Sequence, residues 1–261
     1  MLHGIPYFYI GDINIVGLSI PTILLAIILG KTLHFFILLR ETSRLDLFYS
    51  ATIFLFVLDF AFRFPFSHFL FLISRTLFHN GQFETGRYGM VYFGTFIAIF
   101  PAVYITCVLF RDRANFYKYL DISFLSHTAS MIILRIGTAL NHYHIGKPTD
   151  IAWGIDFGSG QIRHETSFYE IASYSIITIL AFGLRKKITT PGILSLIIIA
   201  WISLSRFVID FFRTSEMGVT SKLNFGISPN QLIFLCFFIA SSFLLFRYRG
   251  LFLKKRYNKK H

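Results

Sequence analysis

Apolar residues fill seven long runs of this chain, and short polar segments separate the runs. A run of about 20 mostly apolar residues is long enough to cross a bilayer as a helix. The fifth run has a short apolar core, and Arg63 and Pro65 interrupt the second. We therefore predict an all-α, polytopic membrane protein with about seven transmembrane helices, all in a single integral membrane domain over residues 1–261. The predicted spans are Ile13–Leu39, Leu47–Ile73, Tyr88–Phe110, Tyr119–Leu140, Phe168–Leu184, Gly192–Phe212 and Ser228–Phe246.

The composition excludes most soluble classes of protein. Of 261 residues, 54% are apolar and only 15% are charged, whereas a soluble domain carries about 25% charged residues. The same numbers exclude a disordered chain. A formal net charge of +12 would suggest nucleic-acid binding on a soluble protein, but here the charges cluster between the apolar runs. We therefore expect membrane lipid and no nucleic acid as a partner.

Lys and Arg are distributed unequally between the two sets of connecting segments. One set, which includes the basic tail at 247–261, carries 15 of these residues, and the opposite set carries six. Because cytoplasmic segments hold the excess of Lys and Arg, we predict a cytoplasmic tail and an N-terminus outside. The N-terminal run lacks the features of a cleaved signal peptide, so we expect a retained span. Residues 141–167, between the fourth and fifth helices, then form a long outer loop, and such loops often carry function.

Several charged residues lie inside predicted spans, where each costs about 2.5–3.5 kcal/mol to insert. Arg206 and Asp210 are four residues apart on one helical face, and Asp59 and Arg63 repeat that spacing. One interpretation is that these are two structural ion pairs that hold the bundle together.

A second interpretation is a polar cavity that opens toward the outer leaflet and accepts an anionic lipid headgroup. Arg135, Arg163, Arg206 and Arg213 all lie near the outer helix ends or in the outer loop. A guanidinium group suits a phosphodiester because it offers parallel donors and stays charged. The charge pattern alone leaves both interpretations open. His142 and His144 lack the carboxylate or thiolate partners of a metal site, so we expect neither a metal nor another cofactor.

Four segments follow, in order and spacing, the signatures of one enzyme family. Leu134–Asn141 with Ile145–Thr149 is similar to G-R-x-G-N-x-x-N-x-E-x-x-G-R/K-P-T, and Arg163–Glu170 is similar to R-H-P-S-Q-L-Y-E. Ser205–Arg213 is similar to F-R-x-x-x-E-x-x-R, and Ile227–Leu232 resembles S-x-G-Q-x-x. Over nearly its whole length, the chain resembles the prolipoprotein diacylglyceryl transferases.

The resemblance implies a lipid-transfer reaction in the bacterial plasma membrane. The family moves the diacylglyceryl group of phosphatidylglycerol to the thiol of a lipobox cysteine in a prolipoprotein, and glycerol phosphate leaves. By position, it assigns catalytic roles to Arg135, Arg206 and His164, with Asp210 orienting Arg206. The positions that it assigns to phospholipid binding are Arg135, Asn141, Gly146, Arg163, Arg206 and Asp210.

Several family positions carry other residues in this chain, Ile202 and Val16 at tyrosine positions among them, and three replacements bear most on the chemistry. Phe93 replaces the histidine of the family's H-G-G motif, Thr138 replaces an Asn and Tyr143 replaces a Glu. A phenyl ring cannot accept a thiol proton, so another base has to serve, and His142, His144 and His164 are candidates. The sequence favours a transferase with an altered base. The alternative is an inactive paralogue that binds anionic phospholipid or lipoprotein precursor without turnover.

Overall fold

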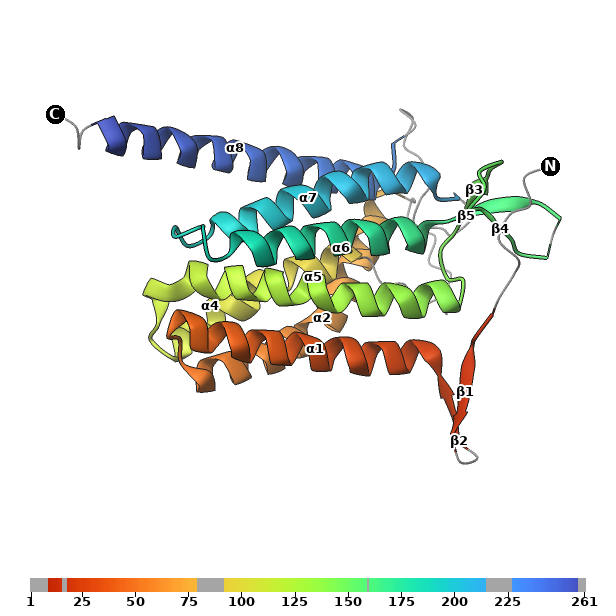
Figure 1. Ribbon diagram of the computed structural model, residues 1–261, viewed down its shortest axis with the longest axis horizontal. Coiled ribbons are helices and arrows are strands. Elements are labelled where there is room, and N and C mark those ends of the chain that lie inside the picture. The colour runs from red at the N-terminus through yellow and green to blue at the C-terminus, as the bar shows by residue number, and fades with distance from the viewer. Residues whose placement is uncertain (1–8, 16–17, 79–91, 159, 215–226, 258–261) are drawn as a thin grey trace.

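The structure is a computed structural model that describes residues 9–15, 18–78, 92–158, 160–214 and 227–257. Long helices run roughly side by side, and small β-elements gather at one end of the bundle (Figure 1). The helices are α1 (Thr22–Leu45), α2 (Tyr49–Phe78), α3 (Tyr92–Ile97), α4 (Ile99–Leu109), α5 (Phe116–Leu140), α6 (Thr166–Leu184), α7 (Ile193–Ile209) and α8 (Pro229–Tyr257), with single 3-10 turns η1 (Arg113–Asn115) and η2 (Asp210–Phe212). The strands are β1 (Asp12–Ile15), β2 (Leu18–Pro21), β3 (Ile145–Pro148), β4 (Ile155–Asp156) and β5 (Ile162–Glu165).

Six helices in the described part of the chain are long and apolar enough to cross a membrane. The remaining predicted span is a shorter apolar helix, Phe93–Leu109, and its predicted start at 88–91 lies outside the described residues. The predicted fold class is therefore confirmed: the protein is an all-α, multi-pass membrane protein. The small sheets are additions to that bundle.

The predicted start of the first span was wrong. The run that starts at Ile13 is not helical until Thr22, because β1 and β2 pair as an antiparallel hairpin over Asp12–Pro21. The last predicted span, Ser228–Phe246, agrees with the apolar span Pro229–Tyr248, and α8 continues beyond it to Tyr257. Charged residues with good helix propensity continue a helix that apolar residues began.

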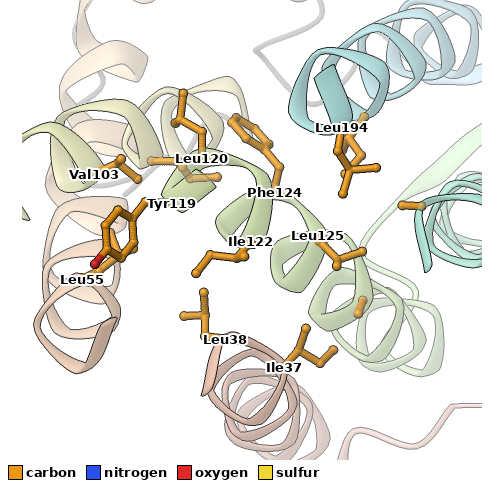
Figure 2. Close-up of a cluster of buried hydrophobic side chains, with 14 of the residues drawn as sticks. Ile37, Leu38, Leu55, Val103, Tyr119, Leu120, Ile122, Phe124, Leu125 and Leu194 are labelled. Carbon is orange, nitrogen blue, oxygen red and sulfur yellow. The ribbon is translucent and has the colours of Figure 1, made fainter. Parts of the chain in front are cut away.

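Helix α5 is the centre of the bundle. Its side chains Tyr119, Ile122 and Phe124 are fully buried and meet residues of the surrounding helices, such as Leu38 of α1 and Leu55 of α2 (Figure 2). A Cβ atom on Gly137 would lie 2.4 Å from the Cβ of Ala26, so α1 and α5 approach more closely than larger residues allow. Small residues at helix contacts are typical of membrane bundles, where packing drives association.

Polar contacts tie the helices together at the end opposite the sheets. The fully buried Glu41 of α1 forms ion pairs with Arg44 and with Arg185, which follows α6. Asp121 of α5 accepts hydrogen bonds from the backbone N–H groups of Gly192 (2.8 Å) and Ser195 (2.7 Å) at the start of α7. A carboxylate there satisfies donors that a helix N-terminus leaves free.

The connection between α5 and α6 is an ordered sheet. Strand β5 lies between β3 and β4, and both of its pairings are antiparallel. The side chain of Glu165 ends the sheet and caps α6 by accepting a hydrogen bond from Ser167 N at 3.0 Å. The sheet therefore fixes where the last turn of α5 and the first turn of α6 lie.

Candidate functional site

Two predicted arginines meet on one carboxylate. Arg135 lies in the last turns of α5, Arg206 near the end of α7 and Glu170 near the start of α6. Arg135 Nε forms an ion pair with Glu170 Oε2, and Arg206 Nη1 forms one with Glu170 Oε1. Glu170 is fully buried, and the arginines are only 6% and 5% exposed. Such a pair is stable only because each charge has a close partner.

A histidine lies between two guanidinium groups. Arg135 Nη1 is 2.8 Å from Nε2 of His144, and Arg213 Nη2 is 2.5 Å from its Nδ1. Thr166 anchors this residue, because its backbone N–H and its hydroxyl both donate to the His144 carbonyl. Burial and the charges of Arg213, Arg135 and Arg206 hold the pKa of His144 well below its ordinary value. The ring is therefore neutral at neutral pH.

Arg213 and Asp210 extend this site toward α8. Asp210 Oδ1 lies 3.7 Å from Arg213 Nη1, and Asp210 Oδ2 accepts a hydrogen bond from Ser228 Oγ at 2.5 Å. Ser228 also caps α8, since its Oγ accepts from Gln231 N while Gln231 Oε1 accepts from Ser228 N. The resemblance gave Asp210 the task of orienting Arg206. The ion pair that the structure gives to Arg206 is with Glu170. The Glu170 cluster is defined here as Arg135, His144, Glu170, Arg206, Asp210 and Arg213.

Gly146 and Asn141 hold the backbone around this cluster. A Cβ atom on Gly146 would lie 2.6 Å from the carbonyl oxygen of Phe212 and 2.7 Å from Cβ of His164. Gly146 also forms an isolated antiparallel bridge with Arg213. The buried Asn141 donates from Nδ2 to the Gly137 carbonyl at 2.8 Å. These two predicted binding residues position the backbone beside the guanidinium groups.

Arg163 and His164 lie on β5 and have other partners. Arg163 donates to Gln161 Oε1 at 3.1 Å in an exposed contact. His164 Nδ1 is 2.6 Å from the hydroxyl of Tyr169, which also accepts from Trp153 Nε1. Burial, and then the charge of Lys147, lower the pKa of His164. His164 therefore belongs to a half-exposed group of aromatic residues beside the Glu170 cluster.

The three replacements that bear most on the chemistry have different surroundings. Phe93 is buried against Phe71 and Phe234, and the guanidinium carbon of Arg206 lies 5.8 Å from the centre of the Phe234 ring. Thr138 donates a hydrogen bond to Ser167 Oγ at 3.3 Å, whereas Tyr143 is 50% exposed. The residue at the position of the family histidine thus lies in an apolar cluster, and the Phe234 ring of this cluster lies beside Arg206.

A second group of buried charges lies in the middle of the bundle. Asp59 Oδ2 is 2.7 Å from Arg63 Nη2, 3.5 Å from Lys31 Nζ and 3.7 Å from His34 Nε2. Arg63 Nη1 also lies 2.7 Å from Nδ1 of His127. The predicted pairing of Asp59 with Arg63 is confirmed. These five residues are called the Asp59 cluster below.

Sequence reasoning named Glu170 as a match to the family pattern but gave it no place in the site. It considered His144 only as one of three possible bases. The sequence did hold one indication that these residues meet. Arg135, Glu170 and Arg206 all lie within two turns of a helix end near the sheet. No group of three metal-ligating side chains occurs in the described residues.

The fold and this arginine-rich site define a multi-pass membrane protein with buried guanidinium groups at the sheet end of its bundle. The sequence model of the family described as prolipoprotein diacylglyceryl transferase matches residues 11–247. The chain belongs to this family.

Several curated relatives are named phosphatidylglycerol–prolipoprotein diacylglyceryl transferase. The chain is 33% identical to the Campylobacter lari protein, over 67% of this chain and 63% of the relative. It is 32% identical to the Campylobacter curvus protein, over 70% of this chain and 64% of the relative. It is 34% identical to the Aliarcobacter butzleri protein, over 59% and 57%. The chain thus spans less than two thirds of the length of these relatives.

Proposed function

We propose that this protein transfers the diacylglyceryl group of phosphatidylglycerol to the cysteine thiol of a lipobox peptide. The observation that carries the proposal is the convergence of Arg135 and Arg206 on Glu170. Membership in the transferase family and the names of the relatives support the same chemistry. A phosphodiester headgroup is an anion that these two guanidinium groups can hold.

The charges of the site favour an anionic ligand. Three guanidinium groups, of Arg135, Arg206 and Arg213, form ion pairs with two carboxylates, of Glu170 and Asp210. Arg135 and Arg206 are buried, and a desolvated guanidinium group binds phosphate oxygens strongly. Phospholipid binding is therefore assigned to Arg135 and Arg206, with Asn141, Gly146 and Asp210 holding their surroundings. Arg163 lies further out, where it is available to a headgroup at the surface.

The reaction is a displacement at carbon. The thiol sulfur attacks the glyceryl carbon that carries the phosphate, a C–S bond forms and the C–O bond breaks. The bond electrons pass to the phosphate oxygen, and glycerol phosphate leaves. Arg135 and Arg206 stabilise the charge that grows on this leaving group, which is the role of preorganised donors in catalysis.

The orientation belongs to the same proposal. The basic connections at α1–α2, α4–α5 and α6–α7 lie toward the end of the bundle where α8 ends, and the sheets lie at the opposite end (Figure 1). By the positive-inside rule, the protein lies in the bacterial plasma membrane with its tail in the cytoplasm. The sheet at 145–165 and the Glu170 cluster then face the outer side, where secreted precursors arrive.

Mass spectrometry tests the proposal. The purified chain in mixed micelles of detergent and phosphatidylglycerol is incubated with a lipobox peptide, and a thioether-linked diacylglyceryl product is expected. Arg206→Ala is expected to abolish product, whereas Lys187→Ala, in the connection between α6 and α7, is the matched control and is expected to retain it. A wild-type chain that forms no product where another family member does would refute turnover.

One observation favours a second candidate function. Phe93 occupies the position of the family histidine, inside an apolar cluster with Phe71 and Phe234. A protein without that base would bind phosphatidylglycerol or a lipoprotein precursor without turnover. This candidate predicts lipid that stays bound through purification and is lost in Arg206→Ala, with no thioether product. Complementation of a strain depleted of its own transferase separates the two candidates.

A further inference from the structure

The surroundings of the His144 ring distinguish it from the other histidines near the sheet. It receives a guanidinium group on each ring nitrogen, Arg135 from α5 on Nε2 and Arg213 from beyond η2 on Nδ1. Arg206 of α7 adds a third positive charge nearby. The carboxylates around these groups are Glu170, on Arg135 and Arg206, and Asp210, on Arg213. Glu165 at the end of β5 also acts on Arg213.

A neutral histidine ring cannot accept hydrogen bonds on both of its nitrogens. A neutral imidazole has one acceptor nitrogen and one N–H donor, and a guanidinium group has donors only. Two guanidinium groups can therefore satisfy only one ring nitrogen, and the other contact places an N–H against an N–H. A ligand with several acceptor oxygens, inserted between the ring and one arginine, gives both donors a partner. A phosphate group is such a ligand.

We propose that His144 takes the proton of the lipobox thiol and passes it to the phosphate that leaves, and so replaces the base that Phe93 cannot provide. This inference rests on the proposed transfer reaction. His144 Nε2 and Arg135 Nη1 are 2.8 Å apart, so a phosphate held by Arg135 lies within reach of the ring.

The protons and electrons of this step balance. The thiol proton moves to the acceptor nitrogen of the His144 ring as sulfur attacks the glyceryl carbon. The electrons of the broken C–O bond pass to the phosphate oxygen, and that oxygen then takes the proton from the imidazolium. The ring returns to its neutral form, so one histidine serves as base and then as acid without any other reactant.

Because of the arginines, the proton affinity of His144 depends on whether the lipid is bound. In the free protein, their charges and burial oppose a second positive charge on the ring, so His144 stays neutral. A bound phosphodiester adds negative charge beside the ring and favours the imidazolium. Binding of phosphatidylglycerol is thus coupled to proton affinity at His144, and a thiol that arrives before the lipid finds a weak base.

Calorimetry of lipid binding tests the coupling. The full chain in detergent is titrated with short-chain phosphatidylglycerol in buffers of different ionisation enthalpy, and the heats report protons taken up on binding. We expect uptake of up to about one proton by the wild type near pH 6. His144→Gln is expected to bind the lipid without that uptake. His68→Gln is the matched control that keeps it, since His68 is a half-buried residue of α2 that stacks on Phe64 and Phe71.

The same variants are then compared in thioether formation. His144→Gln is expected to lose about 10²- to 10⁴-fold in transfer rate while it still binds lipid, because a proton-transfer group contributes about that much. Equal proton uptake or equal transfer in His144→Gln and the wild type overturns the assignment. So does loss of lipid binding in both His144→Gln and His144→Asn, since the ring would then be a binding group.

The outcomes also separate this inference from the proposed function. If the wild type binds no phosphatidylglycerol, the proposed function fails, and the role of His144 fails with it. If the wild type binds lipid and transfers the diacylglyceryl group but His164→Gln, not His144→Gln, removes the proton uptake, only the assignment of His144 is overturned.

Discussion

The Glu170 cluster and the Asp59 cluster are both buried groups of charges, but they lie at different depths. Asp59 is ten residues into α2 and Lys31 is nine residues into α1, so both lie about 13–15 Å along their helices at a rise of about 1.5 Å per residue. Glu170 is four residues into α6, about 6 Å from its start. The Glu170 cluster is therefore at the end of the bundle, and the Asp59 cluster is within it.

Their composition differs as well. The Asp59 cluster is built on a pair four residues apart on one helix, and its further members come from α1 and α5. The Glu170 cluster joins α5, α6, α7 and the loop residue His144, and its guanidinium groups face an imidazole that cannot satisfy them. Buried charge by itself thus fits both a structural and a ligand-binding role. The proposed ligand is assigned to the Glu170 cluster because of its depth and because two guanidinium groups meet on one imidazole there.

The largest expected effect is the removal of the central carboxylates. Glu170→Gln leaves Arg135 and Arg206 without their countercharge, and Asp59→Asn does the same to Arg63. Each change is expected to cost about 3–5 kcal/mol, because it leaves buried charges uncompensated. Thermal unfolding in detergent, with and without phosphatidylglycerol, measures both. Phosphatidylglycerol is expected to raise the thermal stability of Glu170→Gln only. An equal increase for Asp59→Asn would contradict the proposal that the lipid binds at the Glu170 cluster.

The second prediction exchanges arginine for lysine in each cluster. Arg206→Lys keeps the charge but loses the parallel donors that hold a phosphate, so the transfer rate is expected to fall about 10²- to 10³-fold. Arg63→Lys is the matched change in the Asp59 cluster and is expected to leave lipid affinity unchanged. Product formation and lipid binding are measured on both variants. A larger loss of transfer in Arg63→Lys than in Arg206→Lys would contradict the assignment of the reaction to the Glu170 cluster.

The third prediction concerns the backbone that places the Glu170 cluster beside the sheet. Gly146→Ala forces a Cβ atom against the Phe212 carbonyl oxygen, 2.6 Å away, and is expected to cost about 1–3 kcal/mol. Gly183→Ala in α6 is the control, since nothing lies within 4 Å of its Cβ position and alanine favours a helix. Melting temperatures compare the two. Equal melting temperatures of Gly146→Ala and Gly183→Ala would show that β3 can move away from η2 without a cost in stability.

The smallest predicted effect is a pH dependence. Because the pKa of His144 lies well below the ordinary 6.5 in the folded protein, only the unfolded chain takes up this proton as the pH falls below 6.5. Acid therefore favours unfolding, by at most about 1.4 kcal/mol per pH unit from this group. The slope of unfolding free energy against pH, between about pH 6.5 and 5, is expected to be shallower in His144→Gln. Parallel slopes would mean that the ring is already charged in the fold.

The sequence predicted the helices well because a lipid environment demands long apolar runs, and a seven-run chain offers few alternatives. It also predicted the pairing of Asp59 with Arg63, since four residues on one helix fix their separation. The hairpin at Asp12–Pro21 was missed because its apolar residues continue directly into the run of α1.

The convergence on Glu170 lay beyond such reasoning for a physical reason. Helices that are apolar on most sides carry no polar stripe to show which face meets a neighbour. The contacts of Glu170 with Arg135 and Arg206 depend on the rotation of α5, α6 and α7, and close packing sets that rotation. His144 was visible as a candidate base, but its position between two arginines follows only from the fold of the loop.

The contacts of Glu41 with Arg185 and of Asp121 with the start of α7 have a mechanical consequence. They join α1 to the end of α6, and α5 to the start of α7, at the same end of the bundle, so we expect that end to act as a fixed pivot. At the far end, an arriving phosphate competes for the same guanidinium groups that hold the three helix tips together. Substrate entry would then move the sheet-side ends of α5, α6 and α7 apart, while the opposite end of the bundle stays packed and closed to water.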